Sequence, residues 1–515
     1  MSICVILYDN NSKNKLIGFI SLLLSNFLAI SIPLFKNYYL WSPGDPLTHV
    51  ANIRGVIYSN TISVYAYPAL SSLSSVVINT SQVTPRSLTL FLPNIIYFLF
   101  AVGMYVLLRY YSDYEFSVAI GITIVLSTSF GINIFDPARL SYSLVPIIIF
   151  SLSLLNEFKK KEFAIITTLF LAALIPFHPL TAGITLLLFS LYMITYSYGS
   201  SVPQAVEAAS IALIIGAVME LYWIQQFRRT VMIIVSFIGF FNESSSSDGA
   251  NYASLIARAS PDLTLIAQML LLRFGGIVIN GLGALSSVVL LLNARRKYDQ
   301  NNIFIGLSFA LILLLSIASL FIFFFSPFRF LSLIKIFSVV SITLFLDVIF
   351  SHNDIYGSYK TRCYIKNLMY LVVILVVVIS LLSVYPSPQF TKQQNGQVTE
   401  QHVKSTEWIY RHNHNPGVIN LDYLGPAAKR LDTYVHYGDN TGDVIKRIPP
   451  AHFGYENPTR PTYLQISQKG KNFYPSVYPE FRHLWNFYPK DFASLNNQAS
   501  VNQIYSSGDV GIYRI

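Results

Sequence analysis

Long apolar runs separated by short polar segments fill the first three quarters of the chain. A helix needs about 20 apolar residues to cross a bilayer, and on that template the pattern predicts about eleven spans. They lie near residues 16–35, 87–108, 116–135, 141–156, 163–177, 180–198, 205–224, 263–292, 303–325, 330–350 and 368–385. The first run is too long for a signal-peptide core and lacks a clear cleavage site, so we expect it to remain as an anchoring helix.

The pattern changes abruptly after residue 386, where Pro, Asn, Tyr, Gln and charged residues replace the apolar runs. The stretches GVINLDY and NQIYSSGDVGIYRI predict short strands, the second as a hairpin around Ser507 and Gly508. We therefore expect a polytopic α-helical membrane protein with a small α/β or β-rich C-terminal domain. The expected parts are a transmembrane domain over 1–385, its outer loop over 36–86, and a soluble domain over 386–515.

Charge fixes the predicted orientation. Hydrophobic residues make up 53% of the chain and charged residues only 12%, about half the charged fraction of a soluble domain. The basic residues gather between alternate spans, which predicts a cytoplasmic N-terminus and an extracytoplasmic C-terminal domain at the cell membrane. They are Lys13, Lys15, Arg109, the EFKKKE run at 157–162, ARRK at 294–297, Lys360, Arg362 and Lys366. Topology accounts for the net charge of +10, so we expect no nucleic-acid partner.

The outer ends of the predicted spans carry ionisable residues. Asp45 followed by Pro46 is typical of a helix start, which puts Asp45 and His49 on one face. Ionisable groups at membrane depth are costly unless they line a cavity, so their joint placement predicts a polar site near the outer leaflet. An interfacial cap or a helix-end anchor explains each residue alone equally well. The other members are Asp136, His178, Arg228, Arg229 and Arg329.

The first outer loop resembles a known family. GDPLTHVANIRGVIYSNTISVYAYPALSSLSSVVINTSQVTP is similar to the first outer loop of membrane-embedded GT-C glycosyltransferases, particularly archaeal ones. In that pattern an Asp leaves the first helix, a His follows four residues later, and a Tyr-Pro step, here Tyr67-Pro68, leads into a second helix. HPLT at 178–181, the Arg of SPFRF and the C-terminal ending are similar to later landmarks of that superfamily.

The resemblance implies an enzyme that transfers a sugar from a polyprenyl (dolichyl-type) phosphate lipid to an extracytoplasmic glycan, lipid or protein, with inversion. Such transfer has an oxocarbenium-like transition state and needs a carboxylate base, for which Asp45 is the candidate. Asp136 would be a second carboxylate that positions the acceptor or helps to hold a divalent cation, Mg or Mn. The partners implied are the sugar lipid and membrane lipids.

The leaving phosphate would be held by basic residues. A guanidinium matches a phosphate with two parallel hydrogen bonds, so Arg329 is the first candidate, with Arg228 and Arg229 as alternatives. His49 and His178 would bind the phosphate or orient Asp45, and a purely structural role explains each of them equally well.

Two departures from the family pattern narrow the function. The nearest match to a WWDYG-like sequence is WNFYPKDF at 485–492, and the first loop has no paired acid motif DxD. Both departures argue against transfer of a whole lipid-linked oligosaccharide to asparagine, and they leave metal dependence open. His412 and His414 lack a nearby third zinc ligand, so we expect them in a solvated turn.

Two other classes of function stay open. A lipid or glycan flippase would place charged sites near the bilayer midplane and often shows two related halves. The chain shows neither pattern. A non-catalytic scaffold for surface polymers would tolerate Asn at position 45, whereas an enzyme that uses Asp45 as its base would not.

Overall fold

The computed structural model divides into two compact units. One unit, the helical unit, is drawn from 1–29, 94–133 and 137–384, and the other, the mixed unit, from 30–93, 134–136 and 385–515. The residues that the structure describes are 12–36, 38–41, 45–59, 68–127, 135–158, 161–197, 203–225, 263–297, 299–321, 330–351, 359–384, 397–412, 418–420, 445–446, 451–453 and 462–515.

Within the described residues each predicted span overlaps one helix. These helices are α2 (Ser12–Phe35), α5 (Pro85–Tyr111), α6 (Glu115–Ser127), α7 (Pro137–Phe158), α8 (Lys161–Phe177), α9 (Pro179–Ser197), α10 (Pro203–Gln225), α13 (Leu263–Lys297), α14 (Gln300–Phe321), α15 (Leu331–Ser351) and α16 (Tyr359–Val384). In the part of the chain that the structure describes, seven helices are long and apolar enough to cross a membrane, namely α2, α5, α7, α9, α13, α14 and α15. The remaining four contribute shorter apolar helices. The predicted polytopic helical architecture is confirmed.

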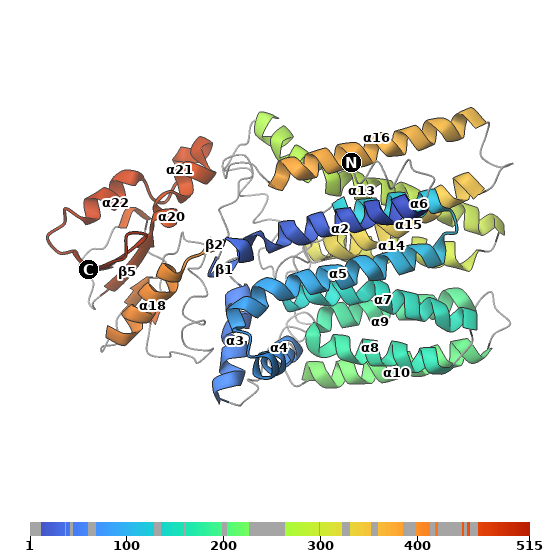
Figure 1. Ribbon diagram of the computed structural model, residues 1–515, viewed down its shortest axis with the longest axis horizontal. Helices are drawn as coiled ribbons and strands as arrows, with labels where there is room; N and C mark the ends of the chain where they lie inside the picture. The colour runs from blue at the N-terminus through green and yellow to red at the C-terminus, as the bar shows by residue number, and fades with distance from the viewer. Residues whose placement is uncertain are drawn as a thin grey trace. The chain divides into compact units, whose positions relative to one another are not determined.

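Proline sets where many of the helices begin. A proline at the first helical position loses no hydrogen bond, because that backbone N–H has no partner within the helix, and its fixed φ suits a helix start. In the first half of the chain the described helices that begin at proline are α4 (Pro68–Ser81), α5, α7, α9 and α10. In the helical unit, α7, α8, α9 and α10 pack against one another, and α13 packs against α14, α15 and α16 (Figure 1).

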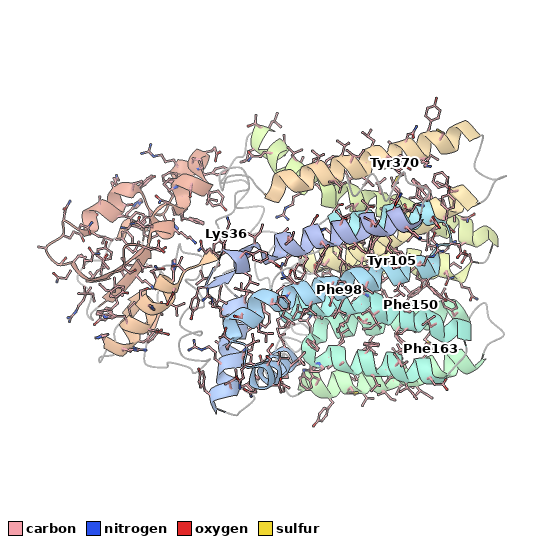
Figure 2. The ribbon with its side chains drawn as sticks, viewed as in Figure 1. Lys36, Phe98, Tyr105, Phe150, Phe163 and Tyr370 are labelled. Atoms are coloured by element: carbon pink, nitrogen blue, oxygen red, sulfur yellow. The ribbon has the colours of Figure 1, made fainter. Side chains whose placement is uncertain are left out.

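The surface of the helical unit is apolar. Phe98 and Tyr105 on α5 (Figure 2) are 48% and 43% exposed, and Leu169 on α8 is 64% exposed. Large apolar side chains in such number on the outside of a helical bundle are expected where lipid, and not water, is the solvent. The helices therefore support a multi-pass membrane protein.

Small residues let α13 and α15 approach closely. A Cβ added at Gly283 would lie 2.5 Å from the Cβ of Ser338 and 2.6 Å from its Cα. One turn further along, the Ser287 hydroxyl donates to the Ser341 hydroxyl at 2.9 Å. Close backbone approach through small residues, supported by hydroxyl hydrogen bonds, is typical of helix pairs in membranes. We call this contact the small-residue seam.

The mixed unit contains a five-stranded sheet in the order β4-β3-β5-β7-β6. The pairs β3–β4 and β3–β5 are parallel, and the pairs β5–β7 and β6–β7 are antiparallel. The strands are β3 (Val418–Asn420), β4 (Ile445–Lys446), β5 (Thr462–Ser467), β6 (Asn502–Ser506) and β7 (Val510–Arg514). Strand β3 lies within GVINLDY, and β6 and β7 form the predicted hairpin, whose turn contains Gly508 at φ +83°.

Short helices accompany this sheet. They are α18 (Glu400–His412), α20 (Gln468–Lys471), α21 (Phe473–Val477), α22 (Pro489–Leu495) and the 3₁₀ helices η3 (Ala451–Phe453) and η4 (Pro479–Leu484). Phe487, Phe492 and Leu495 pack with Leu464 and Ile466 of β5 in one core. The C-terminal part is therefore α/β, as predicted.

The first outer loop belongs to the same packed unit. Strand β1 (Leu40–Trp41) pairs antiparallel with β2 (Gln397–Val398). Helix α3 (Asp45–Ser59) contributes Leu47, Val50 and Ala51 to a core that also contains residues of α18 and β7. Apolar burial thus joins segments that lie hundreds of residues apart in the sequence.

Candidate functional site

Helix α3 begins at the residue predicted to start it. Asp45 is its first residue and Pro46 the next, as the Asp-Pro pair indicates. The side chain of Asp45 lies outside what the structure describes, and so do Arg228, Arg229 and Arg329. The roles predicted for these four side chains stay predictions.

One face of α3 is polar and buried. Thr48, His49 and Asn52 follow Asp45 at the spacing i+3, i+4 and i+7, which aligns the four positions along one side of the helix. The side chains of His49 and Asn52 are 4% and 8% exposed. The opposite face carries Leu47, Val50 and Ala51, which fill the core. We call the first side the polar face of α3.

Two groups on the polar face of α3 have unmet hydrogen-bonding capacity. The Thr48 hydroxyl and the Asn52 amide nitrogen are buried and have no hydrogen-bond partner among the described residues. Buried polar groups in folded proteins nearly always have a partner, and leaving one unpaired costs about 1–3 kcal/mol. Hydroxyl and amide groups placed in this way suit a ligand rich in oxygen, such as a sugar.

Asp136 repeats the Asp-Pro arrangement. It is half-buried and stands directly before Pro137, the first residue of α7. It is counted in the mixed unit, the unit that also contains α3. The structure thus assigns the two candidate carboxylates and His49 to one compact unit.

His178 caps a helix. The backbone N–H of Thr181 donates to Nδ1 of His178 at 3.3 Å, and the Thr181 hydroxyl lies 2.7 Å from the same nitrogen. The Ser141 hydroxyl of α7 in turn donates to the Thr181 hydroxyl at 3.0 Å. A nitrogen that accepts a backbone N–H carries no proton, so the neutral ring holds its proton on Nε2. His178 therefore satisfies a free amide at the start of α9, whereas the predicted contact with phosphate remains a prediction.

Two cations that sequence reasoning missed influence each other electrostatically in the helical unit. The side chain of Lys335 on α15 lies across Gly276 of α13, where an added Cβ would be 3.5 Å from Cε and 4.0 Å from Nζ. Arg273 lies one turn before Gly276 on the same side of α13, and its positive charge acts on Lys335. Two like charges near each other raise the local positive potential, which favours a bound anion.

Glu220 on α10 is a third ionisable residue that sequence reasoning missed. Its side chain is 6% exposed, and Oε2 has no hydrogen-bond partner in the described part of the chain. Its other oxygen, Oε1, faces α9, since a Cβ added at Gly183 would be 4.0 Å away. All three residues interrupt apolar runs, in LLLRFGG, LSLIKIF and AVMELYW. That interruption is the sequence signal that could have identified them.

Two solved structures are similar to this chain. The crystal structure of the Archaeoglobus fulgidus oligosaccharyltransferase, tethered with an acceptor peptide containing the NVT sequon, matches with a TM-score of 0.52 and 12% identity. The match covers 90% of this chain and 71% of that one. The cryo-EM structure of the arabinofuranosyltransferase AftD from Mycobacteria matches with a TM-score of 0.53 and 9% identity, over 96% of this chain and 39% of that one.

Sequence comparison adds no relative. No protein-family model matches the chain, and no curated protein aligns with it significantly. The sequence identity of both structural matches is too low for function to be carried over, so the matches bear on the fold alone. The chain has the GT-C-like fold that its first outer loop predicted, the fold that it shares with an oligosaccharyltransferase and an arabinofuranosyltransferase.

Proposed function

We propose that this protein is a membrane glycosyltransferase that moves a sugar from a polyprenyl-phosphate-type lipid to an acceptor, with inversion. The fold that it shares with two glycosyltransferases supports the general activity. The observation that carries the proposal is the polar face of α3, where a buried hydroxyl and a buried amide that have no hydrogen-bond partner among the described residues follow Asp45.

Asp45 would act as the general base. The acceptor hydroxyl gives its proton to the carboxylate while its oxygen bonds to the anomeric carbon from the side opposite the phosphate. The bond between the anomeric carbon and the phosphate oxygen breaks, and the lipid phosphate leaves with the electron pair. Thr48 and Asn52 would hold the acceptor by hydrogen bonds, and His49 would orient Asp45.

Arg273 and Lys335 join Arg329 as proposed phosphate-binding residues, with Arg228 and Arg229 as alternatives. Negative charge grows on the phosphate as the bond breaks, and cations held in a medium of low dielectric constant stabilise it strongly.

A divalent cation, Mg or Mn, stays a separate prediction, with Asp45 and Asp136 as the residues that would hold it. Among the described residues no three His, Cys, Asp or Glu side chains gather as a ready ligand set. Two carboxylates would leave the other coordination positions to water or substrate oxygens. No step above requires the cation.

Replacing Asp45 by Asn tests the base. We expect transfer from a polyprenyl-phosphate sugar in membranes to fall by about 10²-fold to 10⁴-fold, the usual contribution of a general base, while donor binding persists. Asp113→Asn makes the same change at an exposed acid and should leave turnover unchanged. Unchanged turnover in Asp45→Asn would remove the proposed base. Movement of the lipid across the bilayer without product would favour the flippase alternative.

Replacing Arg273 or Lys335 by Gln tests donor binding separately. Each substitution removes one positive charge from the proposed phosphate-binding residues, so we expect at least a tenfold loss of donor affinity. Lys366→Gln, a cation over the Phe116 and Tyr370 rings, is the matched control. Equal donor affinity in all three variants would show that Arg273 and Lys335 do not bind the donor phosphate.

A further inference from the structure

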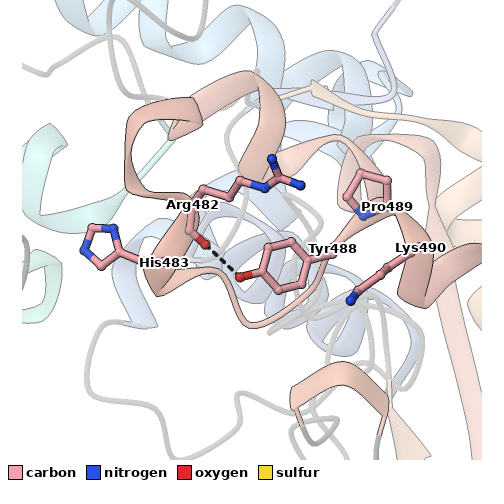
Figure 3. A pocket seen from close by; sticks show the side chains of 5 residues that line it. All are labelled: Arg482, His483, Tyr488, Pro489 and Lys490. Carbon is pink, nitrogen blue, oxygen red and sulfur yellow. Dashed lines mark hydrogen bonds between the residues drawn. The ribbon is translucent and has the colours of Figure 1, made fainter.

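A pocket in the mixed unit combines an aromatic ring with basic side chains. It has a volume of about 670 Å³ and lies between η4 and the start of α22 (Figure 3). The residues that line it are Arg482, His483, Tyr488, Pro489 and Lys490. The pocket includes part of WNFYPKDF, the segment for which the proposed transfer reaction has no use.

The Tyr488 ring is held in place from several sides. Its hydroxyl donates to the backbone carbonyl of Arg482 at 3.0 Å (Figure 3), and its backbone N–H donates to Oδ2 of Asp491 at 2.7 Å. The His452 ring stacks on it with centroids 5.2 Å apart and an angle of 6° between the planes. A ring fixed before binding loses little entropy when a ligand stacks on it.

His452 is itself held in an unusual conformation. Its φ of 55° lies in the left-handed region, which is costly for a residue with a side chain. Its Nδ1 lies 2.7 Å from Oδ2 of Asp491, and this contact keeps the imidazole against Tyr488. Backbone strain of this kind persists where surrounding contacts fix it, and here it positions one side of the aromatic platform.

Three basic side chains line the pocket. The Arg482 guanidinium lies 5.9 Å and the Lys490 ammonium 5.6 Å from the Tyr488 ring centroid, and His483 adds a third basic side chain. Within the described residues neither Arg482 nor Lys490 forms an ion pair. Asp491 is buried and already hydrogen-bonded, and it does not line the pocket. Basic side chains gathered around one pocket favour an anionic ligand.

We propose that this pocket binds an anionic saccharide, a sugar that bears a carboxylate such as a uronic acid. The C–H face of a pyranose ring stacks on an aromatic side chain, and its carboxylate pairs with guanidinium or ammonium groups. A volume of about 670 Å³ falls in the range typical of small-molecule sites. The inference goes beyond the transfer reaction, since it concerns which glycan the C-terminal segment recognises and requires no turnover.

Equilibrium binding tests the inference. The probe is trigalacturonate, titrated into the full chain in detergent and followed by calorimetry, with its neutral methyl ester as the comparison ligand. We expect trigalacturonate to bind at least tenfold more tightly than the ester. Arg482→Gln and Lys490→Gln should each weaken trigalacturonate binding at least tenfold, because each removes one charge from the pocket.

Arg411→Gln on α18 is the matched control, since it removes an exposed arginine from the same unit but outside the pocket. It should leave affinity unchanged. The inference is overturned if the ester binds equally well, if Arg411→Gln weakens binding as much as the pocket variants, or if no binding occurs at millimolar ligand. Equal affinity for hexaglutamate or for phosphatidylglycerol vesicles would also overturn it, because the pocket would then recognise charge alone.

Discussion

Replacing Gly283 by Ala tests the small-residue seam between α13 and α15. The added Cβ would lie 2.5 Å from the Cβ of Ser338 and 2.6 Å from its Cα, whereas carbon atoms in good contact are about 3.5–4.0 Å apart. The helices must separate by about 1 Å, since a backbone atom cannot rotate away. Overpacking of this kind costs about 3 kcal/mol, the upper end of the usual range.

Gly281→Ala is the matched control for this substitution. Gly281 lies on the same helix, and a Cβ there would meet no atom within 4 Å. Both variants gain helix propensity of about 1 kcal/mol, so the difference between them isolates the steric cost. We expect Gly283→Ala to be less stable than wild type by about 2 kcal/mol and Gly281→Ala to be slightly more stable.

Thermal unfolding of the full chain in detergent, followed by circular dichroism, measures this difference. The predicted result is a midpoint several degrees lower for Gly283→Ala than for Gly281→Ala. Equal midpoints for the two variants would show that α13 and α15 do not make this contact, and the reasoning from small residues would fail.

Two further substitutions probe buried polar side chains. Glu220→Met should raise the free energy of unfolding by about 1–3 kcal/mol, because it removes a carboxyl group whose buried Oε2 has no hydrogen-bond partner among the described residues. A lower unfolding midpoint in detergent would instead reveal that the carboxyl group has one. His178→Ala should lose about 1 kcal/mol through its missing cap, while His178→Asn, which can accept the same backbone N–H, should retain most of it. Equal loss in both variants would contradict the capping role.

The sequence was enough to locate the helices, because membrane spans are recognised by length and composition alone. Each predicted span overlaps one helix among the described residues, and the Asp45-Pro46 pair marked the start of α3 correctly. The pairing of β1 with β2 could not be predicted from the sequence, because Leu40 and Val398 are two ordinary apolar residues far apart in the chain. Short strands of two residues carry no periodic pattern to reveal their partners.

The site was only partly accessible from the sequence. The spacing of Thr48, His49 and Asn52 after Asp45 is visible in DPLTHVAN, but whether that face is buried depends on which segments cover it. A search limited to the outer ends of spans passed over Arg273 and Lys335, which lie inside apolar runs. Their importance depends on the close approach of two helices, and spacing along one helix does not reveal it.

The shared core of α3 and the C-terminal segment also has a consequence for biogenesis. Leu47 and Val50 leave the ribosome several hundred residues before Val398 and Ile512, the residues against which they pack. At ordinary rates of synthesis that delay is on the order of tens of seconds. During this interval the apolar side of α3 lacks the C-terminal half of its core, so the bilayer surface or a chaperone would help to keep that side from aggregating.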